Sequence, residues 1–121
     1  MLTAEVKIII KKSEAGNTPA FGRGVCELCS LVDELGSLNK AAQEMGMAYS
    51  KAWRIMKNTE EVFGVELIER RGPKGSVLTE EGKKLVAVYQ TVRSRVNDAA
   101  DAILAEELEK HGMAVKPAAQ L

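Results

Sequence analysis

The spacing of apolar residues changes from a strand period to a helical period early in the chain. Residues 4 to 11 place Val6, Ile8 and Ile10 on one face and mostly charged residues on the other, which predicts a half-buried strand. Residues 13 to 19 combine glycine, asparagine and proline and predict a loop. A strand followed by a loop is therefore expected before the first helix.

Three amphipathic helices are expected between residues 23 and 63. Apolar residues recur every three or four positions over residues 25–35, and a glycine follows them as a stop. Ser37 is a natural N-cap for a short second helix that ends before Gly46. The third helix runs from about residue 48 to residue 63, with an apolar face and a polar, basic face.

Two short β-prone runs and a long helix complete the pattern. VELIERR and SVLT flank GPKG, whose glycines and proline are the residue types that a hairpin connection requires, so we expect a two-stranded wing. Thr79 is suited to cap the next helix, which extends to about His111. Its apolar residues alternate steps of four and three, the kind of seam along which two helices pack. The seam consists of Leu85, Tyr89, Val92, Val96, Ala99 and Ile103.

These elements predict a mainly α protein with a small β component, a winged helix-turn-helix with a long C-terminal dimerisation helix. Residues 1–79 are interpreted as the winged helix-turn-helix DNA-binding domain with its N-terminal strand. Residues 80–111 are interpreted as the dimerisation helix, and residues 112–121 as a flexible tail. About thirty helical residues span roughly 45 Å, more than the remaining small domain can cover, which favours pairing with a second copy.

The charges balance overall but are unevenly distributed. The 121 residues include 17 Lys and Arg and 17 Asp and Glu, and this net charge of +0 excludes attraction to nucleic acid through total charge. Residues 48–58 hold Lys51, Arg54 and Lys57 and no acid, whereas residues 96–109 hold five acids and no base. The third helix is therefore the basic part of a polarised chain.

Two short helices joined at a glycine, with the small residues Ala41 and Ala42 in the first, are typical of a helix-turn-helix. The second helix of such a pair lies in the major groove, and cationic wing residues are suited to phosphate or minor-groove contacts. The candidates for the groove and nearby phosphates are Tyr49, Ser50 and Lys51. Those for the DNA backbone or minor groove are Arg54, Arg70, Arg71 and Lys74.

The chain resembles the N-terminal DNA-binding domain of the molybdate-responsive ModE regulators over roughly residues 5 to 105. The most specific pieces are FG-x-G at Phe21–Gly24, ELGSLNKAAQEMGMAYSKAW, FG-x-x-L-x-ER over residues 63–70 and LTEEG over residues 78–82. LysR-type regulators share a broadly similar winged domain and a linker helix that pairs. Full-length ModE proteins continue into molybdate-binding domains, for which this chain has no length, so the resemblance does not imply oxyanion sensing.

Together these observations predict a transcriptional regulator that binds a pseudo-palindromic operator as a homodimer, through its N-terminal strand region and last helix. The alternative is a protein-interaction module, or a thiol-redox or zinc-responsive module, on the same scaffold. It rests on Cys26 and Cys29, which form C-x-x-C, but the chain offers only one histidine, His111, to complete a zinc site. The favoured interpretation is that both cysteines pack in the core.

Two aromatic residues of the third helix have competing interpretations. Trp53 is expected to wedge this helix against the scaffold rather than to contact bases. Tyr49, at the start of the helix, is balanced between a phosphate contact and packing. Lys57 is interpreted as a solvent-exposed helix lysine without a specific role.

Other classes of function find little support. The chain lacks a glycine-rich phosphate loop after a strand, H-E-x-x-H and G-x-S-x-G, so we expect no enzyme, no cofactor and no metal site. The longest apolar run, Ile8 to Ile10, is far shorter than the ~20 residues of a membrane span, and no secretory signal is visible. The expected setting is the cytoplasm, with double-stranded DNA and a second copy as partners and no membrane.

Overall fold

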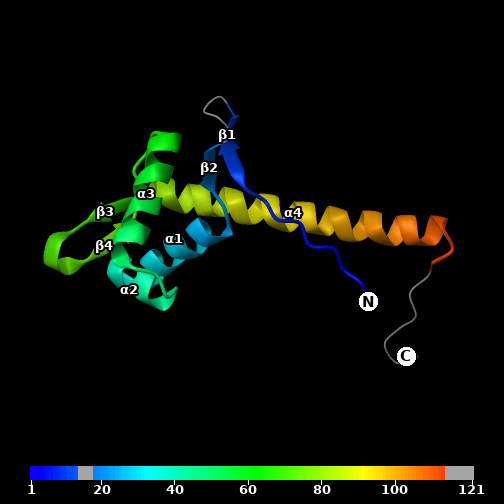
Figure 1. Cartoon of the computed structure of the whole chain (residues 1–121), viewed down its shortest axis with the longest axis horizontal. Helices are drawn as coiled ribbons and strands as arrows, with labels where there is room; N and C mark the ends of the chain where they lie inside the picture. Colours follow the sequence, from blue (N-terminus) through cyan, green and yellow to red (C-terminus); the bar gives the residue numbers. More distant parts are fainter. Residues whose placement is uncertain (14–17, 114–121) are drawn as a thin grey trace. The chain divides into compact units, whose positions relative to one another are not determined.

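The computed structural model describes residues 1–13 and 18–113, and its elements occur in the order predicted for a winged helix-turn-helix (Figure 1). The first strands are β1 (Ile10–Lys12) and β2 (Thr18–Phe21), and the helix-turn-helix region comprises α1 (Arg23–Leu35), α2 (Leu38–Glu44) and α3 (Tyr49–Phe63). The wing consists of β3 (Ile68–Arg70), the 3-10 turn η2 (Gly72–Lys74) and β4 (Ser76–Leu78), and α4 (Glu80–Lys110) follows it. The predicted fold class is confirmed.

The ends of the helices coincide with the capping residues that the sequence predicts. Helix α1 ends at Gly36, which adopts a φ of 70° and donates its N–H to the Val32 carbonyl. The Ser37 hydroxyl accepts a 3.1 Å hydrogen bond from the Lys40 N–H and caps α2. Ala48 begins α3 without a side-chain cap, as its methyl group dictates.

The predicted strand over residues 4 to 11 is wrong for most of its length, because only Ile10–Lys12 is a strand. Residues 1–9 have no regular secondary structure. The predicted loop over residues 13 to 19 is also too long, since β2 begins at Thr18 and pairs antiparallel with β1. Pro19 lies opposite Lys11 in this two-stranded sheet, where a strand edge tolerates a residue without an N–H. Residues 14–17 of that predicted loop lie outside the described residues.

The core of the unit formed by Ile8–Tyr89 joins the helix-turn-helix to β2, the wing and the first part of α4. Phe21 lies at its centre, in edge-to-face contact with Phe63 at 6.4 Å and Tyr89 at 5.3 Å between ring centroids. The Tyr89 hydroxyl donates to the Ile8 carbonyl at 2.9 Å, so the polar end of this buried ring is satisfied. The other buried apolar residues of the cluster are Cys26, Leu28, Cys29, Val32, Leu38, Ala41, Ala42, Ala52, Met56, Leu67, Ile68 and Leu78.

The wing is held close to the turn between α1 and α2. The Ser76 N–H donates to the Gly36 carbonyl at 2.9 Å, and Ile68 pairs with Leu78 across the hairpin. Gly75 has a φ of 90°, and a Cβ added there would lie 2.2 Å from the Gly36 oxygen. Glycine is therefore required at this position both by conformation and by the close approach of the two backbones.

A second unit comprises Met1–Lys7 and the part of α4 that follows Gln90. The Ala4 N–H donates to Asp101 Oδ1 at 2.6 Å, and the Val6 N–H donates to Asn97 Oδ1 at 2.8 Å. These side-chain acceptors bind two backbone N–H groups of the N-terminal segment, which has no regular secondary structure. In the described part of the chain, no helix combines the length and apolar character needed to cross a bilayer.

Candidate nucleic-acid interface

Helix α3 has one face in the core and the other in solvent. Ala52, Met56 and Thr59 are buried, and the Thr59 hydroxyl donates to the Ala20 carbonyl at 2.7 Å. Ala41 and Ala42 of α2 are fully buried as well. Small side chains at these positions let α2 and α3 approach closely, which fixes the outer face of α3 relative to the rest of the domain.

The outer face of α3 presents the polar and basic residues that the sequence predicts there. Its exposed members are Tyr49, Ser50, Lys51, Arg54 and Lys57. Lys57 Nζ lies 3.1 Å from Glu60 Oε1, whereas Lys51 and Arg54 form no ion pair within the described residues. An unpaired cation near a helix start is available to a phosphate or a base edge without first breaking a salt bridge.

The wing adds cations at the end of β3 and beside it. Arg70 and Arg71 are both exposed, and Arg71 has a long 3.9 Å contact to Glu69. An exposed pair at this distance contributes little, so Arg71 remains available to another anion. Lys74 belongs to the η2 turn, and its side chain lies outside the described atoms.

A cavity of 460 Å³ opens between the start of α2, the start of α3 and the wing. Its lining includes Tyr49 of α3 and Arg70 of the wing, together with Ser37, Asn39 and Ser76. Tyr49 therefore points toward the space between α3 and the wing and is not packed in the core. The cavity brings one predicted residue of the helix and one of the wing to a common site.

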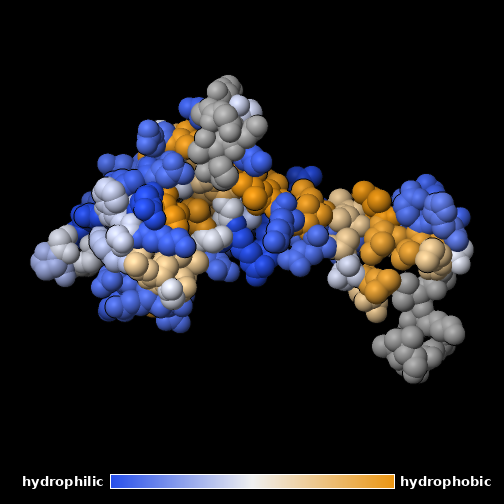
Figure 2. Space-filling view, viewed as in Figure 1, coloured by the Kyte–Doolittle hydropathy of each residue, from blue (hydrophilic) through white to orange (hydrophobic). Residues whose placement is uncertain are grey.

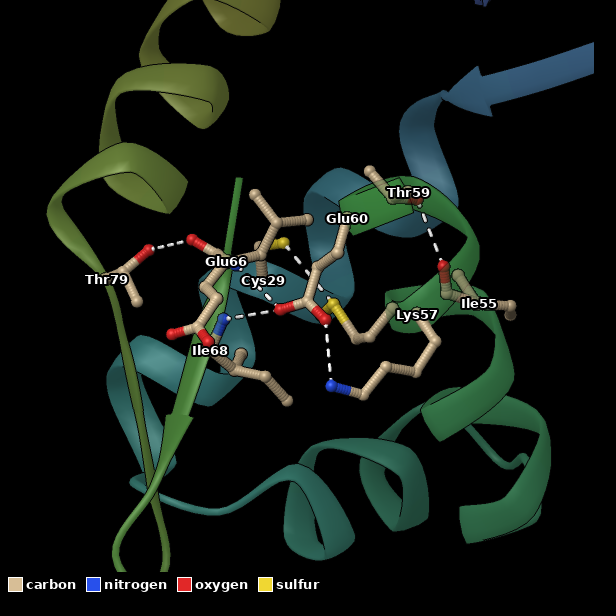
Figure 3. Close-up of polar contacts among 10 residues, drawn as sticks. Cys29, Ile55, Lys57, Thr59, Glu60, Glu66, Ile68 and Thr79 are labelled. Carbon is tan, nitrogen blue, oxygen red and sulfur yellow. Dashed lines mark hydrogen bonds and ion pairs between the residues drawn. The ribbon is translucent and has the colours of Figure 1, made fainter. Parts of the chain in front are cut away.

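Glu60 connects α3 to the wing, a role that sequence reasoning missed (Figure 3). Its side chain is 10% exposed, and Oε2 accepts hydrogen bonds from the Leu67 N–H at 2.8 Å and the Ile68 N–H at 3.4 Å. Oε1 faces Lys57. An acid in a polar helix face gives no sequence signal for such a contact, because its backbone partners carry no side-chain signature.

Trp53 does not wedge α3 against the scaffold, so that prediction is wrong. Its side chain is 39% exposed, with Lys57 Nζ 5.6 Å and Arg70 Cζ 5.7 Å from the ring centroid. The positions of α3 that face the core are taken by Ala52, Met56 and Thr59. The ring instead has a cation of its own helix and a cation of the wing beside it.

Cys26 and Cys29 both belong to the buried core, as the packing interpretation predicts. The Cys29 thiol lies 4.0 Å from the Met56 sulfur. Burial, followed by the charges of Cys26 and Glu60, raises the pKa of Cys29 from 9.0 to about 12. A thiol of this kind is neutral and unreactive near pH 7, unlike a redox-responsive cysteine. Within residues 1–13 and 18–113, His, Cys, Asp and Glu form no group suited to a metal ion.

The raised pKa predicts how stability depends on alkaline pH. Below pH 9.0 the Cys29 thiol is protonated in both states, whereas between pH 9.0 and about 12 only the unfolded chain releases the proton. Above pH 9 the free energy of unfolding should therefore fall with rising pH in the wild-type protein. Its fall should be steeper than that of Cys29→Ala by about 1 kcal/mol for each pH unit. Urea denaturation of both proteins at several pH values measures this difference, and parallel pH profiles would contradict it.

The predicted seam of α4 divides between two environments. Tyr89 is buried in the domain core and Leu85 packs against that core, whereas Val92, Val96, Ala99 and Ile103 are exposed. The exposed Val88 adds to the same side of the helix. Figure 2 shows apolar surface over the C-terminal part of α4.

Comparisons with known proteins agree with this architecture. Residues 26–83 match the family described as bacterial regulatory helix-turn-helix protein, lysR family. The chain is 31% identical over 86 residues to the uncharacterized HTH-type transcriptional regulator YraN of Bacillus subtilis (strain 168), covering 69% of this chain and 29% of YraN. It also resembles the crystal structure of VV2_1132, a LysR family transcriptional regulator, with a TM-score of 0.52 and 23% identity, covering 75% of this chain and 31% of that one.

The chain spans about a third of the length of these relatives. The likeness to VV2_1132 supports the fold, and the family match shows that residues 26–83 are similar to a LysR-type helix-turn-helix. Both agree with the placement of α2, α3 and the wing. Residues 26–83 therefore resemble the helix-turn-helix region of LysR-type regulators.

Proposed function

We propose that this protein is a cytoplasmic transcriptional regulator, without catalytic activity, that binds a pseudo-palindromic operator as a homodimer. The observation that carries the proposal is the outer face of α3, where Lys51 and Arg54 stand exposed without ion-pair partners among the described residues. A rigid helix with such a face fits the major groove, which is about 12 Å wide. Arg70 and Arg71 of the wing supply backbone contacts beside it.

The dimer is proposed from the exposed apolar face of α4. On a helix with 3.6 residues per turn, the stripe of Val92, Val96 and Ile103 lies about 120° around the axis from Asn97 and about 160° from Asp101. Those two residues bind the N-terminal segment, so the segment leaves this stripe uncovered. Exposed apolar stripes mark interaction sites, and a two-fold pairing of α4 would present two recognition helices to two half-sites.

A ModE-type domain is the finer assignment that we propose within the LysR type, on its sequence motifs. The FG-x-G motif supplies Phe21, which is the centre of the core, and the start of α1. The Tyr-x-x-Ala-Trp run supplies Tyr49, Ala52 and Trp53, which respectively line the cavity, pack in the core and contact the wing. A link to molybdenum metabolism is proposed on this resemblance alone.

Substitutions in α3 and the wing test the division of labour on DNA. Lys51 lies in the first turn of α3, where a side chain reaches base edges, so Lys51→Ala should cost about 1–3 kcal/mol on the operator and much less on random DNA. Arg71→Ala should weaken binding to both duplexes alike. It should also lower the salt slope, which is the steepness with which the logarithm of the binding constant falls with the logarithm of the salt concentration, by about 1 for each phosphate that is no longer neutralised. Fluorescence anisotropy on selected and scrambled duplexes across a salt series measures both effects.

The pattern of losses decides the assignment. Equal weakening on both duplexes by Lys51→Ala, together with altered sequence preference in Arg71→Ala, would reverse the two roles. If the protein binds DNA and neither Lys51→Ala nor Arg71→Ala lowers its affinity, the interface lies on another face. A protein that binds no duplex at low salt would overturn the proposed function. The redox alternative is disfavoured by the burial and raised pKa of Cys29.

A further inference from the structure

Trp53 is the single tryptophan of the chain, and it lies on the exposed side of α3 with cations from two different elements beside its ring. Lys57 belongs to the same helix, one turn further on. Arg70 belongs to β3, and its guanidinium carbon lies 5.7 Å from the ring centroid. Both distances are within the roughly 6 Å over which a cation is attracted to an aromatic face.

The contact with Arg70 is the second of two links between α3 and β3. Glu60 holds the beginning of the strand through the Leu67 and Ile68 N–H groups, and Trp53 meets its end at Arg70. Trp53 and Glu60 are seven residues apart, which is about 10 Å along the helix. Their contacts on the strand are two to three residues apart, which is about 7–10 Å. The strand therefore runs antiparallel alongside the helix and is held near both ends.

Arg70 differs from Arg71 in what surrounds its charge. Arg71 has the Glu69 carboxylate at 3.9 Å, whereas within the described residues Arg70 forms no ion pair and its guanidinium lies beside the Trp53 ring. Arg70 also lines the cavity between the starts of α2 and α3 and the wing. A ring holds a cation without neutralising it, so the charge remains available on the cavity side.

We propose that Trp53 is a positioning residue for DNA binding, which holds the Arg70 guanidinium by a cation–π contact so that Arg70 meets a backbone phosphate at this cavity. This inference rests on the proposed function. The ring restricts a flexible side chain at the end of the wing before DNA arrives. The wing and the recognition helix then reach the duplex as one surface, with the cost of ordering Arg70 already met in the unbound protein.

A double-mutant cycle in the full chain tests this role. Trp53→Leu keeps an apolar side chain but removes the ring, and should weaken binding to an in-vitro-selected duplex about two- to fivefold per half-site. In an Arg70→Ala background the same substitution should have no further effect. Trp53→Leu should also lower the salt slope, although it removes no charge, because Arg70 is no longer held at the phosphate. Trp53→Phe, which keeps an aromatic face, should restore most of the affinity and the slope.

Arg71→Ala is the matched control, because it removes the neighbouring arginine that does not contact the ring. Its effect should add to that of Trp53→Leu. In the protein without DNA, Arg70→Ala should change the acrylamide quenching of Trp53 fluorescence, whereas Arg71→Ala should not. An equal loss from Trp53→Leu with and without Arg70, or an unchanged salt slope, would overturn the positioning role while leaving the proposed function intact. A wild-type protein that binds no DNA would overturn both.

Discussion

Replacing Val92 and Val96 together with aspartate should give monomers and weaken binding to a full operator by at least about a hundredfold. Both valines are exposed on α4, at 41% and 37%, and share a side of the helix with Ile103. A charge buried between two copies of α4 would lack a partner and carry a large desolvation cost. Binding to a single half-site should change little, because the recognition helix belongs to the other unit. Sedimentation over a concentration series, with full-site and half-site duplexes, measures both results.

Thr91→Asp with Ser94→Asp is the matched control for this experiment. It adds the same number of charges to the same stretch of α4, at exposed positions about 120° and 180° around the helix from the stripe. This variant should remain dimeric and bind the full site normally. A Val92 and Val96 variant that sediments like the wild type would remove α4 from the interface.

Much of the fold could be predicted because its determinants are local. Ser37 and Thr79 are caps whose hydroxyls accept backbone N–H groups three residues on, and the structure has both contacts. Gly36 ends a helix with a positive φ, as its position after an apolar repeat indicates. Such signals lie within one or two turns of the element that they bound, so a single sequence carries them.

The N-terminal region could not be predicted because its partners are distant in the chain. Val6 and Ile8 alternate with charged residues as in a strand, but the Val6 N–H finds Asn97 instead of a second strand. Conversely, Pro19 argues against a strand, yet it lies in β2 opposite Lys11. For Val6 a contact 91 residues away decides the structure, and for Pro19 the pairing of β2 with β1 does so, in each case against the local preference.

The candidate DNA-binding face was predictable in its residues but not in what holds them in place. Helical spacing alone places Lys51 and Arg54 outward, and they are exposed. The same spacing says nothing about Trp53 and Arg70, because their contact joins two elements. It also hides Glu60, which turns toward backbone groups of the wing. The exposed face of α3 thus combines residues available to DNA with residues that position the wing.

Glu60→Leu should lower the free energy of unfolding by about 2–4 kcal/mol, which is a drop of about 10–20 °C in Tm for a domain of this size. The substitution leaves the Leu67 and Ile68 N–H groups without their acceptor in a place where only 10% of the Glu60 side chain meets solvent. Each unsatisfied group costs about 1–3 kcal/mol. Glu60→Gln keeps one acceptor oxygen at the same reach and should lose about half as much. Thermal and urea denaturation of the three proteins measure these differences.

Glu61→Leu is the control, because this neighbouring carboxylate is exposed and should change stability by no more than about 0.5 kcal/mol. The Glu60 variants should also lose DNA affinity, through the wing. Without the Glu60 contact, β3 is held less firmly to α3, so the arginines of the wing should be less ordered and the salt slope should fall toward that of Arg71→Ala. Lys51, at the other end of α3, should keep its preference for the operator. A Glu60→Leu protein with unchanged stability would show that the carboxylate does not hold the wing. A loss of sequence preference with an unchanged salt slope would show that the substitution acts on the recognition helix α3 instead.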